Sequence, residues 1–157
     1  MIDTYHGTAR LLDFLPDVAL PPVSLSDLTG DTSKGGIGAS WSGLSRRVAE
    51  AWVGPARDLS CGQCRMLVGQ RLGLRWLALP VATFAARYPQ AECDLYPGDL
   101  TVSALLAWRD LVVFAPDATR VMLKCDFGWL RNQAQEDVSA GSILAHAVQA
   151  LDGAARA

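Results

Sequence analysis

The chain of 157 residues has the length of one ordinary domain, and half of its residues are hydrophobic, which is enough to bury a sizeable core. The formal net charge of −2 and the lack of any Lys/Arg-rich run interleaved with aromatic residues argue against direct binding of nucleic acid. The longest apolar run, residues 76–86, is shorter than the roughly 20 residues of a membrane-spanning helix, and the N-terminus lacks the pattern of a secretory signal. We therefore expect a cytoplasmic protein that makes no membrane contact and whose four cysteines stay reduced.

Residues 1–40 form a lead-in with a composition of its own. They contain five Asp residues but only Arg10 and Lys34 as bases, and three prolines interrupt them. Residues 29–43 are rich in Gly and Ser and lack periodicity, which is typical of a loop. This composition predicts an irregular, acidic, Pro/Gly-rich lead-in with a short helix near residues 8–15. A small pair of strands near the N-terminus remains an alternative.

Beyond the lead-in, apolar residues recur at the spacing of amphipathic helices. Pro116 and Asp117 supply a turn and an N-cap for one stripe, and Pro80 predicts that its helix begins near it or bends there. The run LVVF, residues 111–114, is too short to specify a strand. We expect an all-α fold, a compact single-domain bundle of about five to seven helices over residues 41–157. The stripes are Leu44, Val48 and Trp52; Leu74, Leu77, Val81, Phe84 and Tyr88; Val121, Met122, Cys125 and Trp129; and Ile143, Leu144, Ala147, Val148 and Leu151.

Residues 59–74, LSCGQCRMLVGQRLGL, contain a Cys-x-x-Cys motif formed by Cys61 and Cys64. A zinc site would need a second closely spaced Cys/His pair, and the other cysteines and histidines are isolated in the sequence. A redox pair would gain from a helix N-terminus, which favours the thiolate, but the β-strand that precedes such pairs is missing. A thiol-disulfide oxidoreductase and a zinc-stabilised adaptor remain alternative functions. The isolated residues are His6, Cys93, Cys125 and His146.

A packing role explains more of the same stretch. Ser60 and Gln63 have the spacing of a capping box, and Leu59 and Cys64 have the spacing of a hydrophobic staple. In the helix that follows, both cysteines fall on or beside the apolar face, where a thiol acts as a small hydrophobic group. We therefore predict that this stretch is a capped helix with cysteines in its packing face.

The body of the chain resembles a known family, the bacterial contact-dependent growth inhibition immunity proteins. Residues 59–74 are similar to the capped helix of that family, L-S-x-x-x-x-R-x-L-[IV]-G-Q-x-[IL]-G-L, and Cys61 and Cys64 stand where acidic and basic residues are often found. Residues 92–100 resemble its segment E-x-D-[FL]-Y-x-G-D-L. The shared stretch runs from about Leu59 to Trp108, and residues 20–28, LPPVSLSDL, resemble the N-terminal approach to it. After about Phe114 no motif matches.

The resemblance implies a protein without catalytic activity or cofactor that binds a toxin. Its partner would be the cognate C-terminal toxin domain of a secreted effector, held in a one-to-one complex in the cytoplasm. Toxins that such proteins neutralise are frequently nucleases. An inhibitor of a nuclease can use carboxylates to match the basic groove that holds phosphate.

Acidic clusters are the candidates for contact with that toxin. No basic residue lies between Arg87 and Arg109, and this interval holds three carboxylates and a tyrosine of the type that anchors interfaces. A scaffold role is the alternative, since Asp99 precedes an apolar run as an N-cap would, and Asp94 can close a turn. A second group of candidates is the pair of adjacent acidic residues at positions 136 and 137. The candidate residues are Glu92, Asp94, Tyr96, Asp99, Glu136 and Asp137.

Overall fold

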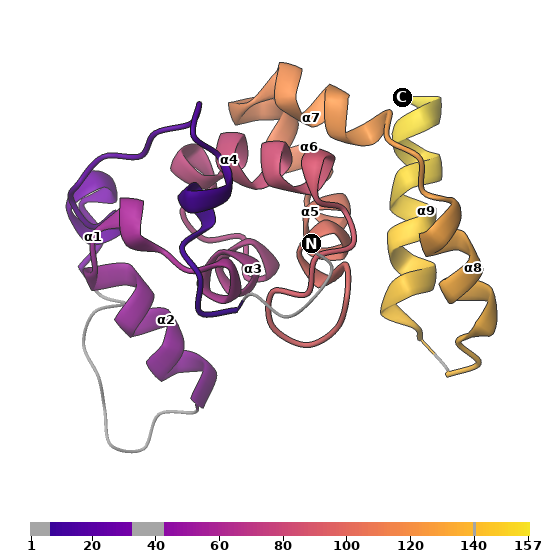
Figure 1. Cartoon of the computed structure of the whole chain (residues 1–157), viewed down its shortest axis with the longest axis horizontal. Coiled ribbons are helices and arrows are strands. Elements are labelled where there is room, and N and C mark those ends of the chain that lie inside the picture. The colour runs from indigo at the N-terminus through magenta and orange to yellow at the C-terminus, as the bar shows by residue number, and fades with distance from the viewer. Residues whose placement is uncertain (1–6, 33–42, 140) are drawn as a thin grey trace.

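The computed structural model describes residues 7–32, 43–139 and 141–157, and it is all-helical over these ranges (Figure 1). No strand occurs in these ranges, and their β-type backbone pairing is limited to isolated bridges. The predicted all-α class is therefore confirmed, although the nine α-helices of the described residues exceed the expected number. The elements are η1 (Leu11–Phe14), α1 (Leu25–Thr29), α2 (Gly43–Val53), η3 (Ala56–Asp58), α3 (Cys61–Gly69), α4 (Leu74–Arg87), α5 (Asp99–Leu106), α6 (Trp108–Phe114), α7 (Pro116–Leu123), α8 (Gly128–Glu136) and α9 (Ile143–Arg156).

Breaks in the second half of the chain account for the extra helices. Single residues, Ala107 and Ala115, separate α5 from α6 and α6 from α7. The stripe expected to run from Val121 to Trp129 is divided between α7 and α8, because the Asp126 carboxylate accepts a hydrogen bond from the Gly128 N–H at 2.9 Å and forms a turn between them. The run LVVF is the end of α6 and not a strand.

Helix α4 lies at the centre of the core and packs against α5, α6 and α7. Its predicted apolar stripe is confirmed, since Leu77, Val81 and Phe84 are fully buried. The helix continues through Pro80, so the expectation that it begins near this proline is wrong. No helix of the described residues combines the length and the apolar character that crossing a bilayer requires.

The described part of the lead-in packs on the body of the protein. Leu11, Leu15 and Leu25 are buried in the same core as α3 and α4. The Leu11 N–H donates to the Leu59 carbonyl at 3.0 Å, and the Cys61 N–H donates to Ala9 at 2.8 Å. The short helix expected near residues 8–15 is the 3-10 helix η1. The predicted boundary at residue 40 and His6 lie outside the described residues.

Helix α3 begins with the predicted capping box. The Ser60 hydroxyl accepts the Gln63 N–H at 3.1 Å, and the Gln63 side-chain carbonyl accepts the Ser60 N–H at 3.0 Å. Reciprocal bonds of this kind satisfy amides that the first turn leaves without partners. The capping box therefore fixes where the cysteine pair enters the core.

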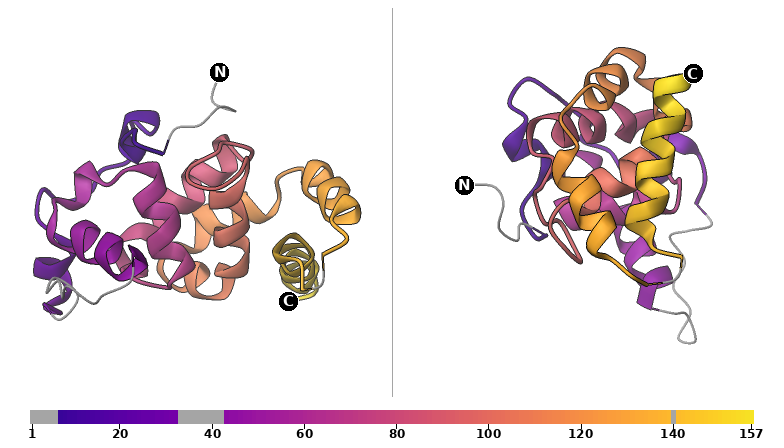
Figure 2. Two further views of the ribbon diagram at one scale, coloured as in Figure 1. Left: turned by 90° about the horizontal axis from the view of Figure 1, so that it is seen from below. Right: turned by 90° about the vertical axis from the view of Figure 1, so that its right-hand side faces the viewer.

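Helices α8 and α9 form a hairpin at one end of the molecule (Figure 2). Leu130 of α8 and Ala147 and Leu151 of α9 are buried, the two helices pack on each other, and α9 also packs on α5. The hairpin reaches the segment before α5 through Trp129, whose ring lies over Gly98. It thus supports the segment that carries the first group of candidate residues.

Candidate functional site: the loop before helix α5

Asp99 organises the loop of residues 88–98 between α4 and α5. Its side chain is fully buried, and one carboxylate oxygen accepts the Cys93 N–H at 2.9 Å while the other accepts the N–H groups of Asp94 at 2.8 Å and Leu95 at 2.7 Å. The predicted N-cap role is wrong, since Gly98 is the N-cap of α5 and Asp99 is its first residue. A partner cannot reach Asp99, so it leaves the set of contact candidates and is scaffold.

Further main-chain contacts close the loop. The Gly98 N–H donates to the Ala91 carbonyl at 3.0 Å, and the Thr101 hydroxyl donates to the Pro89 carbonyl at 2.6 Å. Gly98 has a φ of 85°, and a β-carbon there would lie 2.6 Å from the ring of Trp129. A glycine is required at this position both by the backbone conformation and by the approach of α8.

Asp94 joins the loop to two helices. Its carboxylate pairs with Arg47 of α2 at 3.0 Å and with Arg65 of α3 at 3.4 Å, and 13% of its side chain is exposed. Two cations therefore balance its charge, and little of the carboxylate remains for a partner. The scaffold interpretation fits Asp94 better than direct contact, while Arg47 and Arg65 are site residues that the sequence did not indicate.

The exposed residues of the loop are Gln90, Leu95 and Pro97, and the candidates Glu92 and Tyr96 are partly exposed. Leu95 has 62% of its surface exposed, whereas Glu92 and Tyr96 are half-buried. Burial is the main cause that raises the pKa of the Tyr96 hydroxyl, and the charge of Asp99 raises it further. The hydroxyl therefore stays protonated at neutral pH. Leu95 was not among the predicted contacts, although an apolar side chain between polar loop residues is a signal for one.

Glu136 and Asp137 lie at the far end of α8. The Asp137 carboxylate accepts hydrogen bonds from the Ser139 hydroxyl, from the Ser142 hydroxyl at 2.6 Å and from the Ser139 N–H at 3.1 Å. These bonds lower the pKa of Asp137, and the bond from the Ser139 hydroxyl contributes most. Asp137 shapes the turn into α9. Glu136 is exposed at the end of α8, two turns or about 10 Å from Trp129. Glu136 therefore lies two turns of α8 away from the contact of Trp129 with the loop.

The cysteine pair lies in the core. Cys61 and Cys64 are fully buried, and Cys93 of the loop is buried beside Cys61. The pKa of the Cys64 thiol is raised mainly by burial. The pKa of the Cys93 thiol is raised most by its hydrogen bond with Cys61 and, to a smaller extent, by burial. Thiol redox chemistry and zinc binding both use the thiolate, which this environment disfavours. In the ranges that the structure describes, no cluster of His, Cys, Asp and Glu is arranged to hold a metal ion.

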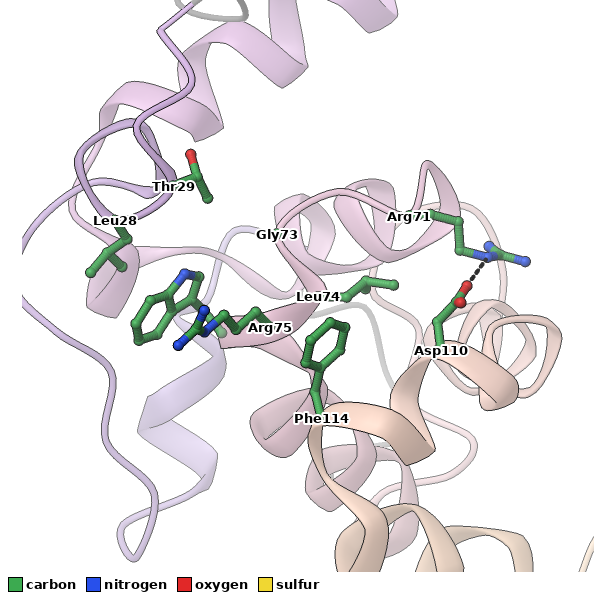
Figure 3. A pocket seen from close by; sticks show the side chains of 9 residues that line it. Leu28, Thr29, Arg71, Gly73, Leu74, Arg75, Asp110 and Phe114 are labelled. Carbon is green, nitrogen blue, oxygen red and sulfur yellow. Dashed lines mark ion pairs between the residues drawn. The ribbon is translucent and has the colours of Figure 1, made fainter.

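A groove lies at the other end of α4. It has a volume of about 520 Å³ and runs between α1, the first turn of α4 and the end of α6 (Figure 3). Arg71 and Asp110 form an ion pair at 3.6 Å along one edge. The groove shares no lining residue with the loop of residues 88–98.

Comparison with protein-family models, with curated proteins and with solved structures gave no match to this chain.

Proposed function

We propose that this chain is an immunity protein of a contact-dependent growth inhibition system. It acts without catalysis in the cytoplasm and forms a one-to-one complex with the cognate C-terminal toxin domain, a nuclease, of a secreted effector. Binding neutralises the toxin and so protects the cell that produces it. The resemblance of residues 59–74 and 92–100 to this family of immunity proteins motivates the proposal, and the loop of residues 88–98 supports it.

The observation that carries the proposal is the preorganisation of this loop. One buried carboxylate fixes three consecutive amides, and yet Leu95 at the tip points its side chain to solvent. An exposed apolar group on a rigid segment is unfavourable in an isolated molecule but favours binding, because little conformational entropy is lost when the partner arrives. Glu92 and Tyr96 border Leu95 with the charge and the aromatic ring that interfaces use.

The charge distribution fits a local contact. Several acidic side chains of the described residues pair with an arginine, as Asp94 does with Arg47 and Arg65. Glu92 has no such ion pair within those residues, so it can meet a basic groove without competition. Glu136, exposed at the end of α8, is a further acidic candidate that lies apart from the loop. The expected contact is therefore a small apolar centre with acidic neighbours.

A binding experiment with the toxin domain encoded directly upstream of this chain tests the proposal. Co-purification and calorimetry should give a one-to-one complex with a Kd of about 1 nM, near −12 kcal/mol, since a catalytic toxin has to be blocked almost completely. Expression of this chain should restore growth to cells that produce the toxin. A toxin domain that fails to bind at micromolar concentration would overturn the proposal.

A pair of variants locates the contact. Leu95→Asp should raise the Kd by at least about tenfold, because it places a carboxylate in the apolar centre of the interface. Val113→Asp is the matched control, since Val113 is 70% exposed on α6 and lies outside the loop. Equal affinity of the two variants would show that the toxin binds another surface, even if the complex itself forms.

A further inference from the structure

The groove at the beginning of α4 has features of a binding surface. Its floor is Leu74, and its walls include Leu28 of α1 and Phe114 of α6. Phe114 keeps 48% of its surface exposed, which is unfavourable for an aromatic ring without a partner. The groove is open to solvent, and Figure 3 shows the side chains that line it. An open groove of this kind covers one side of a ligand and suits a segment of a larger molecule better than an enclosed small molecule.

The two arginines of the groove differ in their contacts. Arg71 is committed to the protein itself, because it donates to the Val68, Gly69 and Leu106 carbonyls at 3.0–3.2 Å and pairs with Asp110. Arg75 is exposed, and its guanidinium lies over the indole of Trp76 at 5.4 Å from the ring centroid. Among the described residues it has no carboxylate partner, whereas seven other arginines do: Arg10, Arg47, Arg65, Arg71, Arg87, Arg120 and Arg131.

We propose that this groove docks an acidic peptide segment of a partner protein. A carboxylate of that segment pairs with Arg75, and an adjacent apolar side chain covers Phe114 and Leu28. The charge complementarity rests on Arg75, whose planar guanidinium keeps its donors at the edge while one face contacts Trp76. Arg, Trp and Phe side chains together are the composition that protein interfaces favour at their centres.

The inference goes beyond the proposed function and does not depend on it. The groove lies at the first turn of α4, and the loop of residues 88–98 follows its last turn. A helix of 14 residues spans about 21 Å, so the two surfaces are separate. One partner can occupy the loop while another occupies the groove.

An NMR titration of the full chain with two peptides tests the inference. The probes are the blocked hexapeptides Ala-Glu-Phe-Leu-Glu-Ala and Ala-Gln-Phe-Leu-Gln-Ala. The acidic peptide should cause saturable shifts of the Trp76 indole signal and of the amides of Gly73, Arg75 and Phe114, with a Kd of about 1 mM or below. The neutral peptide should bind at least about tenfold more weakly, because it lacks the charge-assisted hydrogen bond to the guanidinium.

Matched variants separate the proposed contact from general attraction between charges. Arg75→Ala should weaken binding of the acidic peptide by about tenfold or more. Arg109→Ala should leave it nearly unchanged, since Arg109 stacks in the same way over Trp108 at 5.3 Å but does not line the groove. Equal effects of both variants, equal binding of both peptides or no shift in the groove would each overturn the proposal. So would concentration-dependent shifts of the groove signals in the protein alone, because they would identify a second copy of the chain as the occupant.

Discussion

At the scale of single residues, Asp99 determines the shape of the loop before α5. Its buried carboxylate accepts hydrogen bonds from three consecutive loop amides at 2.7–2.9 Å. A buried charge is tolerable only when such bonds replace the water that solvated it. If the acceptor is lost, the amides remain buried without partners or the loop has to open.

Replacement of Asp99 should therefore be costly. We expect Asp99→Ala to lower the free energy of unfolding by about 3 kcal/mol, because three donors lose a charged acceptor and part of the loop rehydrates. Asp99→Asn should cost less, since its amide keeps one oxygen as an acceptor. Urea denaturation followed by circular dichroism measures both.

Asp117 provides the control for Asp99. It also lies in the first turn of a helix, α7, but its side chain is 99% exposed. Asp117→Ala should leave the unfolding midpoint nearly unchanged. Similar losses for Asp99 and Asp117 would contradict the organising role of the buried carboxylate.

At the scale of elements, the contact of Trp129 with Gly98 couples the α8–α9 hairpin to the loop. The ring atoms of Trp129 leave no room for a β-carbon at Gly98, where it would lie 2.6–2.7 Å from them. Close packing of this kind transmits a shift of the helix directly to the loop. The hairpin is thus part of what keeps the loop in one conformation.

A comparison of two glycines measures this coupling. Gly98 and Gly141 both have positive φ, 85° and 68°, but a β-carbon at Gly141 meets no atom within 4 Å. Gly141→Ala should cost about 1 kcal/mol of unfolding free energy from backbone strain alone, and Gly98→Ala about 2–4 kcal/mol because the clash with Trp129 adds to it.

The excess cost at Gly98 should fall when the ring is removed, so Gly98→Ala should be less destabilising in a Trp129→Ala background. Thermal or urea unfolding of the four proteins gives the coupling energy. Equal costs at the two glycines, or no coupling to Trp129, would contradict the contact.

The sequence predicted elements whose signals are local. The Ser60 and Gln63 pair, three residues apart, identifies the start of α3 and forms the predicted bonds. The contacts of the candidate site are not local, because the Arg47–Asp94 pair joins residues 47 positions apart. The helix end at Ala107 also lacks a glycine or proline signal, so tertiary packing and not local preference decides it. The end of α6 at Ala115 does have a local signal, because Pro116 follows it.

At the scale of the whole molecule, one core holds the described lead-in, the central helices and the hairpin together. Leu11 of η1, Phe84 of α4 and Leu151 of α9 all belong to it. The sequence predicted this core from the helical stripes of α4 and α9, but it did not predict that η1 and α1 contribute to it. The sequence of the lead-in looks irregular because helices as short as η1 and α1 contain too few apolar residues to show helical periodicity.

The same core predicts the reactivity of the thiols. Of the four cysteines, Cys61, Cys64 and Cys93 are buried and Cys125 is partly exposed. We expect one thiol to react quickly with a thiol reagent in the native protein, while the other three react only when the core opens. Quantitative thiol titration with and without urea measures the two classes.

Substitution of cysteine identifies the fast thiol. Cys125→Ser should remove the fast class, whereas Cys64→Ala should leave it and lower stability through the cavity that it creates. Fast reaction of Cys61 and Cys64 in the native protein would favour the thiol-disulfide oxidoreductase over the immunity protein.

Asp99 holds the loop through main-chain N–H groups, which every residue type other than proline provides. The side chains of Glu92, Leu95 and Tyr96 accept none of these bonds, so substitutions there leave the hydrogen bonds to Asp99 in place. Under the proposed function, the loop is therefore an exchangeable binding segment on a constant frame. A chain with this frame can acquire a new binding specificity by a few point substitutions, and residues 92, 95 and 96 are the positions to randomise in a selection for new partners.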